Sequence, residues 1–251
     1  MSHHIVEFKD VYYQYPDGKQ AVNGLSARII HGESVGLVGA NGAGKTSLLM
    51  LLTGILSATA GQIRVGDTVL TKRTLPLIRR TIGFSFQNPD DQLFMSRVYD
   101  DVAFGPRNYG LDEQEVEYRV LKALETVGAA HLKDRPPYKL SGGEKRAAAL
   151  AAVLSMEPNI LVLDEPTAAL DPRSRRRLIN LLKGFTHTKI IATHDMDMVM
   201  ELCERAIGLN EGCIHFDGAS QEVLVNQKLL AECGLEMPLA LQGCPRCHNQ
   251  V

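Results

Sequence analysis

The sequence lacks several features that would place it in other classes of protein. It contains no run of about eighteen apolar residues, so no segment has the length and composition of a transmembrane helix. Residues 1–4 lead at once into a charged, strand-like segment, and a signal peptide is therefore not expected. The net charge of −2 gives no general electrostatic reason to expect nucleic-acid binding.

Cysteines and repeated patterns are also scarce. Of the five cysteines, Cys203, Cys213 and Cys233 stand apart in the sequence, as reduced thiols of a cytosolic protein do. Internal repeats, low-complexity segments and heptad runs are absent. We therefore expect a soluble, intracellular protein with one large domain, or one domain with a subdomain, built around a substantial core.

The chain is organised around a phosphate-binding pattern, G-x-x-x-x-G-K-T at residues 39–46, which follows an apolar run at residues 35–38. Its glycines let the backbone curl so that successive N–H groups point into one concavity, and a helix opening near Lys45 adds its positive end. Lys45 can reach the β- and γ-phosphates, and the Thr46 hydroxyl can coordinate Mg²⁺. The expected ligands are thus a nucleoside triphosphate and Mg²⁺, bound through Gly39, Asn41, Gly42, Gly44, Lys45, Thr46 and Ser47.

Secondary-structure patterns place this loop in an α/β protein. Residues 5–30 alternate apolar and polar side chains around turn chemistry and predict an antiparallel β layer. Further strands are expected at residues 35–38, 62–65, 82–86, 160–163 and 189–193, and helices at residues 45–52, 75–80, 196–203 and 221–233, with another from Pro172. A β hairpin is expected at residues 207–216, around Asn210-Glu211-Gly212, and residues 234–251 show no clear pattern.

Between Gln87 and Leu140 the strand signals vanish and helical spacing takes over. Asp112 is the expected N-cap of a helix there, with Glu115 three residues further on, and Gly128 is its expected stop. This stretch predicts an inserted, mostly helical subdomain.

Two carboxylates end the buried strand at residues 160–163. Asp164 and Glu165 lie at the edge where ligands of open α/β sheets bind. In a phosphate-loop NTPase the first acid holds Mg²⁺ and the second polarises the attacking water as general base. An isolated Asp-Glu pair could instead satisfy a helix dipole, but its occurrence beside a complete phosphate loop favours the catalytic interpretation.

A second anion-binding terminus is predicted where Ser141-Gly142-Gly143 precedes a helix starting at Glu144. This motif resembles the signature of ATP-binding-cassette (ABC) ATPases. Together with the phosphate loop and the acid pair, it makes the chain resemble an ABC ATPase over residues 5–218. The resemblance implies a head-to-tail homodimer in which Ser141, Gly142 and Gly143 cap the ATP on the partner's phosphate loop. The family usually has Gln where this chain has Glu144, which we take as a tolerated variant.

The resemblance also assigns roles to four further residues. Tyr15 matches the aromatic residue that stacks on adenine, and Gln87 matches the loop glutamine that touches Mg²⁺ or water. Asp171 matches the residue that contacts the opposing phosphate loop. His194 follows the strand at residues 189–193 and matches the switch histidine that contacts the γ-phosphate. The implied catalytic residues are Glu165, His194 and Gln87, and the implied Mg²⁺ ligands are Thr46, Gln87 and Asp164.

The family implies a fold with a P-loop NTPase (RecA-like) core, an antiparallel β subdomain and an inserted α-helical subdomain. The expected divisions are residues 1–86 for the core with its β subdomain, 87–150 for the helical signature subdomain, 151–218 for the rest of the core, and 219–251 for a C-terminal helix and tail.

The stretch at residues 87–94, Gln-Asn-Pro-Asp-Asp-Gln-Leu-Phe, resembles energy-coupling-factor importers, and the similarity continues at residues 102–106. It is close to the cobalt and nickel uptake ATPase subunits. This implies a peripheral dimer on the cytoplasmic face of the cell membrane, bound to a transmembrane scaffold subunit and a membrane substrate-binding subunit, without nucleic acid. Vitamin importers of the same type share these motifs, so the transported substrate could instead be a vitamin. Two other functions are alternatives to import: the ATPase of an ABC exporter, and a soluble ABC protein that acts on nucleic acid or ribosomes.

The end of the chain carries a C-x-x-C-H spacing at Cys244, Cys247 and His248. Alone, this spacing suggests haem attachment or part of a thiolate-rich metal site. A Zn²⁺ or Co²⁺ site would need further ligands, for which His3, His4 or a second protomer are candidates. The competing interpretation is a frayed, reduced tail.

Overall fold

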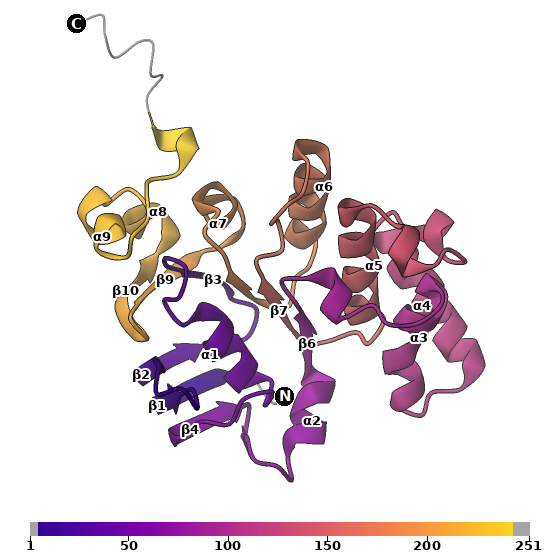
Figure 1. Cartoon of the computed structure of the whole chain (residues 1–251), viewed down its shortest axis with the longest axis horizontal. Helices are drawn as coiled ribbons and strands as arrows, with labels where there is room; N and C mark the ends of the chain where they lie inside the picture. The colour runs from indigo at the N-terminus through magenta and orange to yellow at the C-terminus, as the bar shows by residue number, and fades with distance from the viewer. Residues whose placement is uncertain (1–4, 243–251) are drawn as a thin grey trace, which may run out of the picture. The chain divides into compact units, whose positions relative to one another are not determined.

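The computed structural model describes residues 5–242 and divides into two compact units (Figure 1). The first unit consists of Met1–Leu75 and Thr188–Val251, and the second of Pro76–His187. Within the described residues, no helix is long and apolar enough to cross a membrane.

The first unit contains the predicted antiparallel β layer, with strand order β2-β1-β4-β5. Its strands are β1 (Val6–Gln14), β2 (Gln20–Ile29), β4 (Ala60–Val65) and β5 (Thr68–Val69). Alternation along β1 buries Val6, Phe8, Val11 and Tyr13, because successive side chains of a strand point to opposite faces.

The same unit contains a mainly parallel set of strands with the order β10-β9-β3-β8. The elements are β3 (Ser34–Val38), β8 (Thr188–Ala192), β9 (Arg205–Asn210), β10 (Cys213–Ala219), α1 (Lys45–Leu52) and α7 (Met196–Leu202). Strand β3 pairs in parallel with β8 and β9, and every residue of β3 and β8 is buried. Such continuous burial is typical of parallel strands covered on both faces, and it explains why they read as apolar runs.

The C-terminal helix predicted at residues 221–233 is wrong in one respect: it is two short helices, α8 (Ser220–Val223) and α9 (Gln227–Glu232). The chain breaks because the Asn226 side chain accepts a hydrogen bond from the N–H of Leu229 and so caps a new helix. A 3₁₀ turn, η4 (Leu239–Leu241), follows in the stretch that showed no pattern.

The second unit pairs β6 (Ile82–Ser85) in parallel with β7 (Ile160–Asp164) and is otherwise helical. Its helices are α2 (Leu75–Thr81), η1 (Pro89–Asp91), α3 (Val98–Asn108), α4 (Glu113–Thr126), η2 (Ala130–Leu132), η3 (Pro137–Lys139), α5 (Gly142–Leu154) and α6 (Pro172–Lys183). The absence of strands between β6 and β7, all of it described chain, confirms the predicted helical insertion.

The predicted ends of α4 are also confirmed. The Asp112 carboxylate accepts the N–H of Glu115 at 2.9 Å. Gly128 follows the last turn with φ of 71°, the left-handed conformation that glycine adopts without a steric cost. Apart from the C-terminal helices, the predicted strands and helices are found within about three residues of their expected bounds.

Candidate functional site

The phosphate-binding loop joins β3 to α1, and its backbone requires glycine at two positions. Gly39 has φ of 154° and Gly44 has φ of 105°. A Cβ atom would come within 2.4 Å of the Leu209 carbonyl oxygen at Gly39, and within 2.3 Å of the Ala21 carbonyl oxygen at Gly44. The loop therefore packs directly against neighbouring backbone. This contact fixes the turn that directs successive N–H groups of the loop into one anion-binding concavity.

The mouth of this loop is electropositive. Helix α1 begins at Lys45 with no acidic residue in its first turn, so no side chain there neutralises the positive end of the helix. Lys45 is 6% exposed, and its ammonium donates hydrogen bonds to the carbonyl oxygens of Gly39 and Ala40 at 2.7 and 3.1 Å. It is held beside the loop, where it can transfer to phosphate oxygens.

Tyr15 and Ser47 are brought together, because their hydroxyl groups share a hydrogen bond of 2.9 Å. Tyr15 is half-buried and packs edge-on against Tyr13, which fixes its ring. The predicted adenine-stacking residue is thus tied to the first turn of α1.

His194 lies at the same sheet edge as the phosphate loop. Thr193 lies between the end of β8 and His194. Its N–H donates a hydrogen bond of 3.0 Å to the carbonyl oxygen of Leu37, near the end of β3. The imidazole is exposed. Parallel strands place their carboxyl ends together, which is why two motifs far apart in the sequence meet here.

In the second unit, Gln87 and the acid pair share an edge in the same way. Ser85 of β6 is in register with Leu163 of β7, so the exposed Gln87 and the buried Asp164 and Glu165 follow neighbouring strand ends. Glu165 has φ of 44°, a left-handed conformation that costs a non-glycine residue roughly 1–2 kcal/mol. Strained backbone of this kind is often found at functional positions.

Arg146 is a site residue that sequence reasoning missed. It lies on α5, is 6% exposed, and its guanidinium donates to the carbonyl oxygens of Phe86 and Gln87 at 2.8 and 2.6 Å. Burial lowers the pKa of Arg146, and the charges of Asp164 and Glu165 act in the opposite direction. One side chain thus links the signature helix, the glutamine loop and the acid pair. A charged residue in the apolar stripe of α5 was the available signal.

The signature motif begins α5 two residues earlier than predicted, at Gly142, because Ser141 is its N-cap. The Ser141 N–H and hydroxyl both donate to the Glu144 carboxylate at 2.8 Å, and the Glu144 N–H points back to the Ser141 hydroxyl oxygen at 3.4 Å. This is a capping box, which needs Glu or Gln at the fourth position. Hydrogen bonds from the Ser141 N–H and hydroxyl lower the pKa of Glu144, and the charges of Arg135 and His131 act in the same direction.

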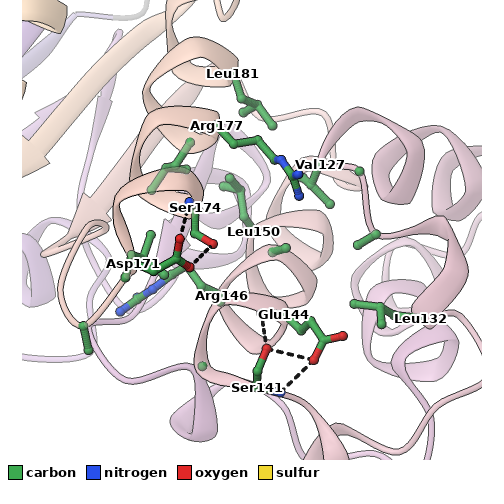
Figure 2. A pocket seen from close by; sticks show the side chains of 18 of the residues that line it. Val127, Leu132, Ser141, Glu144, Arg146, Leu150, Asp171, Ser174, Arg177 and Leu181 are labelled. Carbon is green, nitrogen blue, oxygen red and sulfur yellow. Dashed lines mark hydrogen bonds between the residues drawn. The ribbon is translucent and has the colours of Figure 1, made fainter.

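Asp171 caps α6, and together with Ser141 of the signature motif it lines the cleft drawn in Figure 2. Its carboxylate accepts the N–H groups of Arg173 and Ser174 and the Ser174 hydroxyl, whose hydrogen bond is 2.6 Å long and lowers the Asp171 pKa. The cleft has a volume of about 560 Å³, and its residues include Leu132, Ser141, Leu150, Asp171, Arg177 and Leu181. In Figure 2, Arg177 reaches from α6 towards Val127.

The predicted tail site lies outside the described residues, since His3, His4, Cys244, Cys247 and His248 are all beyond 5–242. Within 5–242, no group of three or more His, Cys, Asp or Glu side chains is arranged to hold a metal ion. The described cysteines Cys203, Cys213 and Cys233 are free thiols. Burial raises the pKa of Cys203 to about 12, which makes that thiol unreactive.

Comparison with known proteins decides the family. The family model described as ABC transporter matches residues 22–168, more than half of the chain. The chain is an ABC transporter ATPase. It is 60% identical over 247 residues to a protein of Geobacter sulfurreducens named as an ABC transporter ATP-binding protein, covering 98% of this chain and 99% of that one.

The ATPase also resembles energy-coupling-factor proteins. It is 41% identical to the energy-coupling factor transporter ATP-binding protein EcfA of Methanocaldococcus jannaschii, over 94% of this chain and 86% of that one. Its fold matches CbiO1 of Clostridium perfringens, described as part of the ABC transporter complex CbiONQ, with 38% identity, a TM-score of 0.80 and coverage of 92% and 94%.

A second solved structure with a similar fold is a dimer. The ABC cassette MJ0796, solved as a dimer in a post-hydrolysis state with ADP and Pi, matches with 26% identity and a TM-score of 0.79, over 86% of this chain and 98% of that one. ABC ATPases function as dimers with transmembrane components. The present ATPase therefore binds ATP and couples its hydrolysis to transport.

Proposed function

We propose that this ATPase drives an energy-coupling-factor importer for cobalt or nickel ions, as a homodimer on the cytoplasmic face of the membrane. The observation that carries the proposal is the stretch at residues 87–94, which begins with Gln87 and resembles the same region of energy-coupling-factor importers. The similarity to EcfA and CbiO1 supports the importer type.

In this proposal each ATP lies between two chains. The phosphate loop and Tyr15 of one chain hold the nucleotide, and Ser141, Gly142 and Gly143 of the other cap its γ-phosphate. Thr46, Gln87 and Asp164 hold Mg²⁺, whose chemistry is to neutralise charge on the transferred phosphate. Glu165 takes the proton of the attacking water, His194 contacts the γ-phosphate, and Asp171 contacts the partner's phosphate loop. The donors present suit this group, because a buried carboxylate and a hydroxyl are the oxygen ligands that Mg²⁺ prefers.

The region after Gln87 has the form expected of a surface that receives a membrane subunit. Asp101 is 4% exposed, and its carboxylate accepts the N–H groups of Phe94 and Met95 at 2.9 and 3.0 Å. These hydrogen bonds fix the backbone at Phe94, which is 62% exposed. The Phe94 ring packs edge-on against the Phe104 ring, with the ring centroids 5.0 Å apart. An exposed aromatic pair held on a fixed loop is suited to burial against an apolar partner.

The test is purification of the tagged full-length chain from detergent-solubilised native membranes, with mass spectrometry of its partners and metal analysis. We expect transmembrane subunits holding Co²⁺ or Ni²⁺. A vitamin in the membrane subunit would keep the importer and change its substrate. Export-type subunits, or ribosomes and nucleic acid alone, would contradict the proposal.

Two single-residue variants test whether the membrane subunits bind at Phe94. Phe94→Ser should lose the membrane subunits while the purified chain still hydrolyses ATP. Ile30→Ser is the matched control, because Ile30 is an exposed apolar residue of the first unit and should leave the complex intact. Equal recovery of partners with both variants would place the contact elsewhere.

A further inference from the structure

The C-terminal strap, defined as residues 233–242, contacts two parts of the first unit that flank the candidate nucleotide site. At its start, the Cys233 carbonyl accepts the N–H of Ala40, in the phosphate loop, at 3.1 Å. Near its end, the N–H groups of Leu239 and Ala240 donate to the Asp197 carboxylate at 3.1 and 2.9 Å. The strap therefore connects the phosphate loop to the helix that follows His194.

The phosphate-loop end of the strap is rigidly built. Helix α9 closes with Gly234 at φ of 66°, and the N–H groups of Gly234 and Leu235 bond back to the carbonyls of Ala231 and Leu230. This arrangement is a Schellman motif, which satisfies carbonyl groups in the last turn of the helix and fixes the path of the chain that follows. A Cβ atom on Gly234 would lie 3.1 Å from the Ala40 Cβ atom, so the strap packs directly on the loop.

The turn between β9 and β10 completes this contact. The Asn210 side-chain amide donates to the Glu232 carbonyl at 3.0 Å, and the N–H of Gly212 in the same turn donates to the Ala43 carbonyl at 3.1 Å. The end of α9, the hairpin turn and the phosphate loop thus support one another. Cys233 is 1% exposed, which fixes the carbonyl that receives the Ala40 N–H.

The other end of the strap is anchored by a carboxylate that α7 does not need for its own start. Asp195 already caps α7 by accepting the N–H of Met198 at 3.0 Å. The two oxygens of Asp197 are instead directed to the strap, one to each N–H group. Since His194 precedes Asp195, movement of this first turn would displace the imidazole.

We infer that the C-terminal strap positions both ends of the nucleotide site, through Gly234 at the phosphate loop and Asp197 at the switch histidine. The inference rests on the proposed roles of the loop and of His194. Neither Gly234 nor Asp197 touches the substrate in this account, so both act as positioning residues. The two ends have different consequences: the loop end governs ATP affinity, and the α7 end governs the rate of hydrolysis.

The α7 end is tested with Leu239→Pro in the full-length chain. Proline removes one N–H donor to Asp197 and fits the site, because Pro238 has ψ of 137° and the first residue of a 3₁₀ turn tolerates proline. We expect kcat to fall about threefold to tenfold while the Kd for ATP stays within about twofold. Leu239→Ala is the control, because it keeps the N–H and removes only a side chain that is 73% exposed.

The loop end is tested with Gly234→Ala, for which we expect the Kd for ATP to rise about fivefold with kcat at saturating ATP nearly unchanged. Gly110→Ala is the matched control. Gly110 has φ of 75°, also ends a helix, and has nothing within 4 Å of its would-be Cβ atom, so it carries the same backbone cost without contact to the loop.

The outcomes separate the inference from the proposed function. Thermal unfolding of each variant identifies loss of the fold, which by itself would weaken ATP binding and lower kcat together. If the parent hydrolyses ATP and both strap variants match their controls in Kd and kcat, the strap has no positioning role and the proposed function stands. If the parent itself neither binds nor hydrolyses ATP, the proposed function fails, and the inference fails with it.

Discussion

Glu165 combines burial, a left-handed backbone and a place at a strand end, and the proposed chemistry depends on it most directly. Its side chain is 5% exposed and its φ is 44°. A general base contributes about 10²- to 10⁴-fold to the rate of a hydrolysis. Glu165→Gln should therefore lower phosphate release by about that factor and leave the Kd for ATP within about twofold, because glutamine keeps the shape and loses the base. Parental turnover in this variant would contradict the assignment.

In the proposed site, the role of Lys45 is to bind ATP and not to cleave a bond. Its ammonium is held at 2.7 Å from the Gly39 carbonyl, in reach of any anion that enters the loop. Charge-assisted hydrogen bonds contribute about 1.5–3 kcal/mol, so Lys45→Ala should weaken ATP binding by about 10- to 100-fold. Fluorescent-nucleotide titration measures this directly. Unchanged affinity would show that the loop binds ATP without its lysine.

Glu144 gives a pH-dependent prediction. Its pKa in the folded protein is lowered, chiefly by the Ser141 N–H and hydroxyl groups, so its ionised form stabilises the fold above the ordinary carboxyl pKa of about 4.3. That contribution is lost as the pH falls through the lowered pKa. Glutamine can also form a capping box but carries no charge for Arg135. The parent should thus unfold at higher urea than Glu144→Gln at pH 7, and the difference should shrink below about pH 4.3.

The control for this pH series is Glu125→Gln. Glu125 is an exposed glutamate of α4, and its replacement should leave the urea midpoint nearly unchanged across the same range. A parent-to-variant difference at Glu144 that stays constant with pH would mean that packing, and not charge, distinguishes the two side chains.

At the scale of the elements, Arg146 connects α5 to the chain after β6 through two carbonyl oxygens. Lysine presents a single point charge and cannot serve both carbonyls in one plane. Arg146→Lys should lower the unfolding free energy by about 1–3 kcal/mol, since a buried acceptor is left unsatisfied, and should slow hydrolysis through Gln87. Urea denaturation measures the first effect, with the exposed Arg177→Lys as the control. Equal midpoints for the two variants would show that the Arg146 hydrogen bonds to Phe86 and Gln87 do not stabilise the fold.

Local patterns predicted most of these elements because the deciding interactions are close in sequence. The α4 helix has its cap at Asp112 and its stop at Gly128, and the strands of the core are continuous apolar runs. The break between α8 and α9 was missed because the apolar pattern continues across it. There, one side-chain cap at Asn226 outweighs helix propensity over a few residues.

The candidate site could be predicted only in part, because only some of its interactions are between residues close in the sequence. Motif residues such as Lys45 and Glu165 carry their chemistry in a fixed local spacing. Arg146 and Gly234 act through contacts with residues 59 and 194 positions away in the chain, Gln87 and Ala40, and no local pattern encodes those contacts. The Glu144 capping box could be predicted in part. The sequence shows the Ser141-to-Glu144 spacing, but only the structure shows that the helix begins at Gly142.

At the scale of the whole molecule, one chain carries every element of the proposed site. A dimer of identical chains would therefore hold two equivalent nucleotide sites, each needing a phosphate loop from one chain and Ser141 from the other. In this dimer, ATP itself would join the two chains, and Glu165 would activate the water that then hydrolyses it.

Joining of the two chains by ATP is measured by light scattering of purified Glu165→Gln, with and without MgATP. We expect a mass near the chain mass of 27.6 kDa without nucleotide and about twice that value with MgATP. The Lys45→Ala, Glu165→Gln double variant should stay at the lower mass under both conditions. A mass that does not change when Glu165→Gln is saturated with MgATP would show that ATP does not join the two chains.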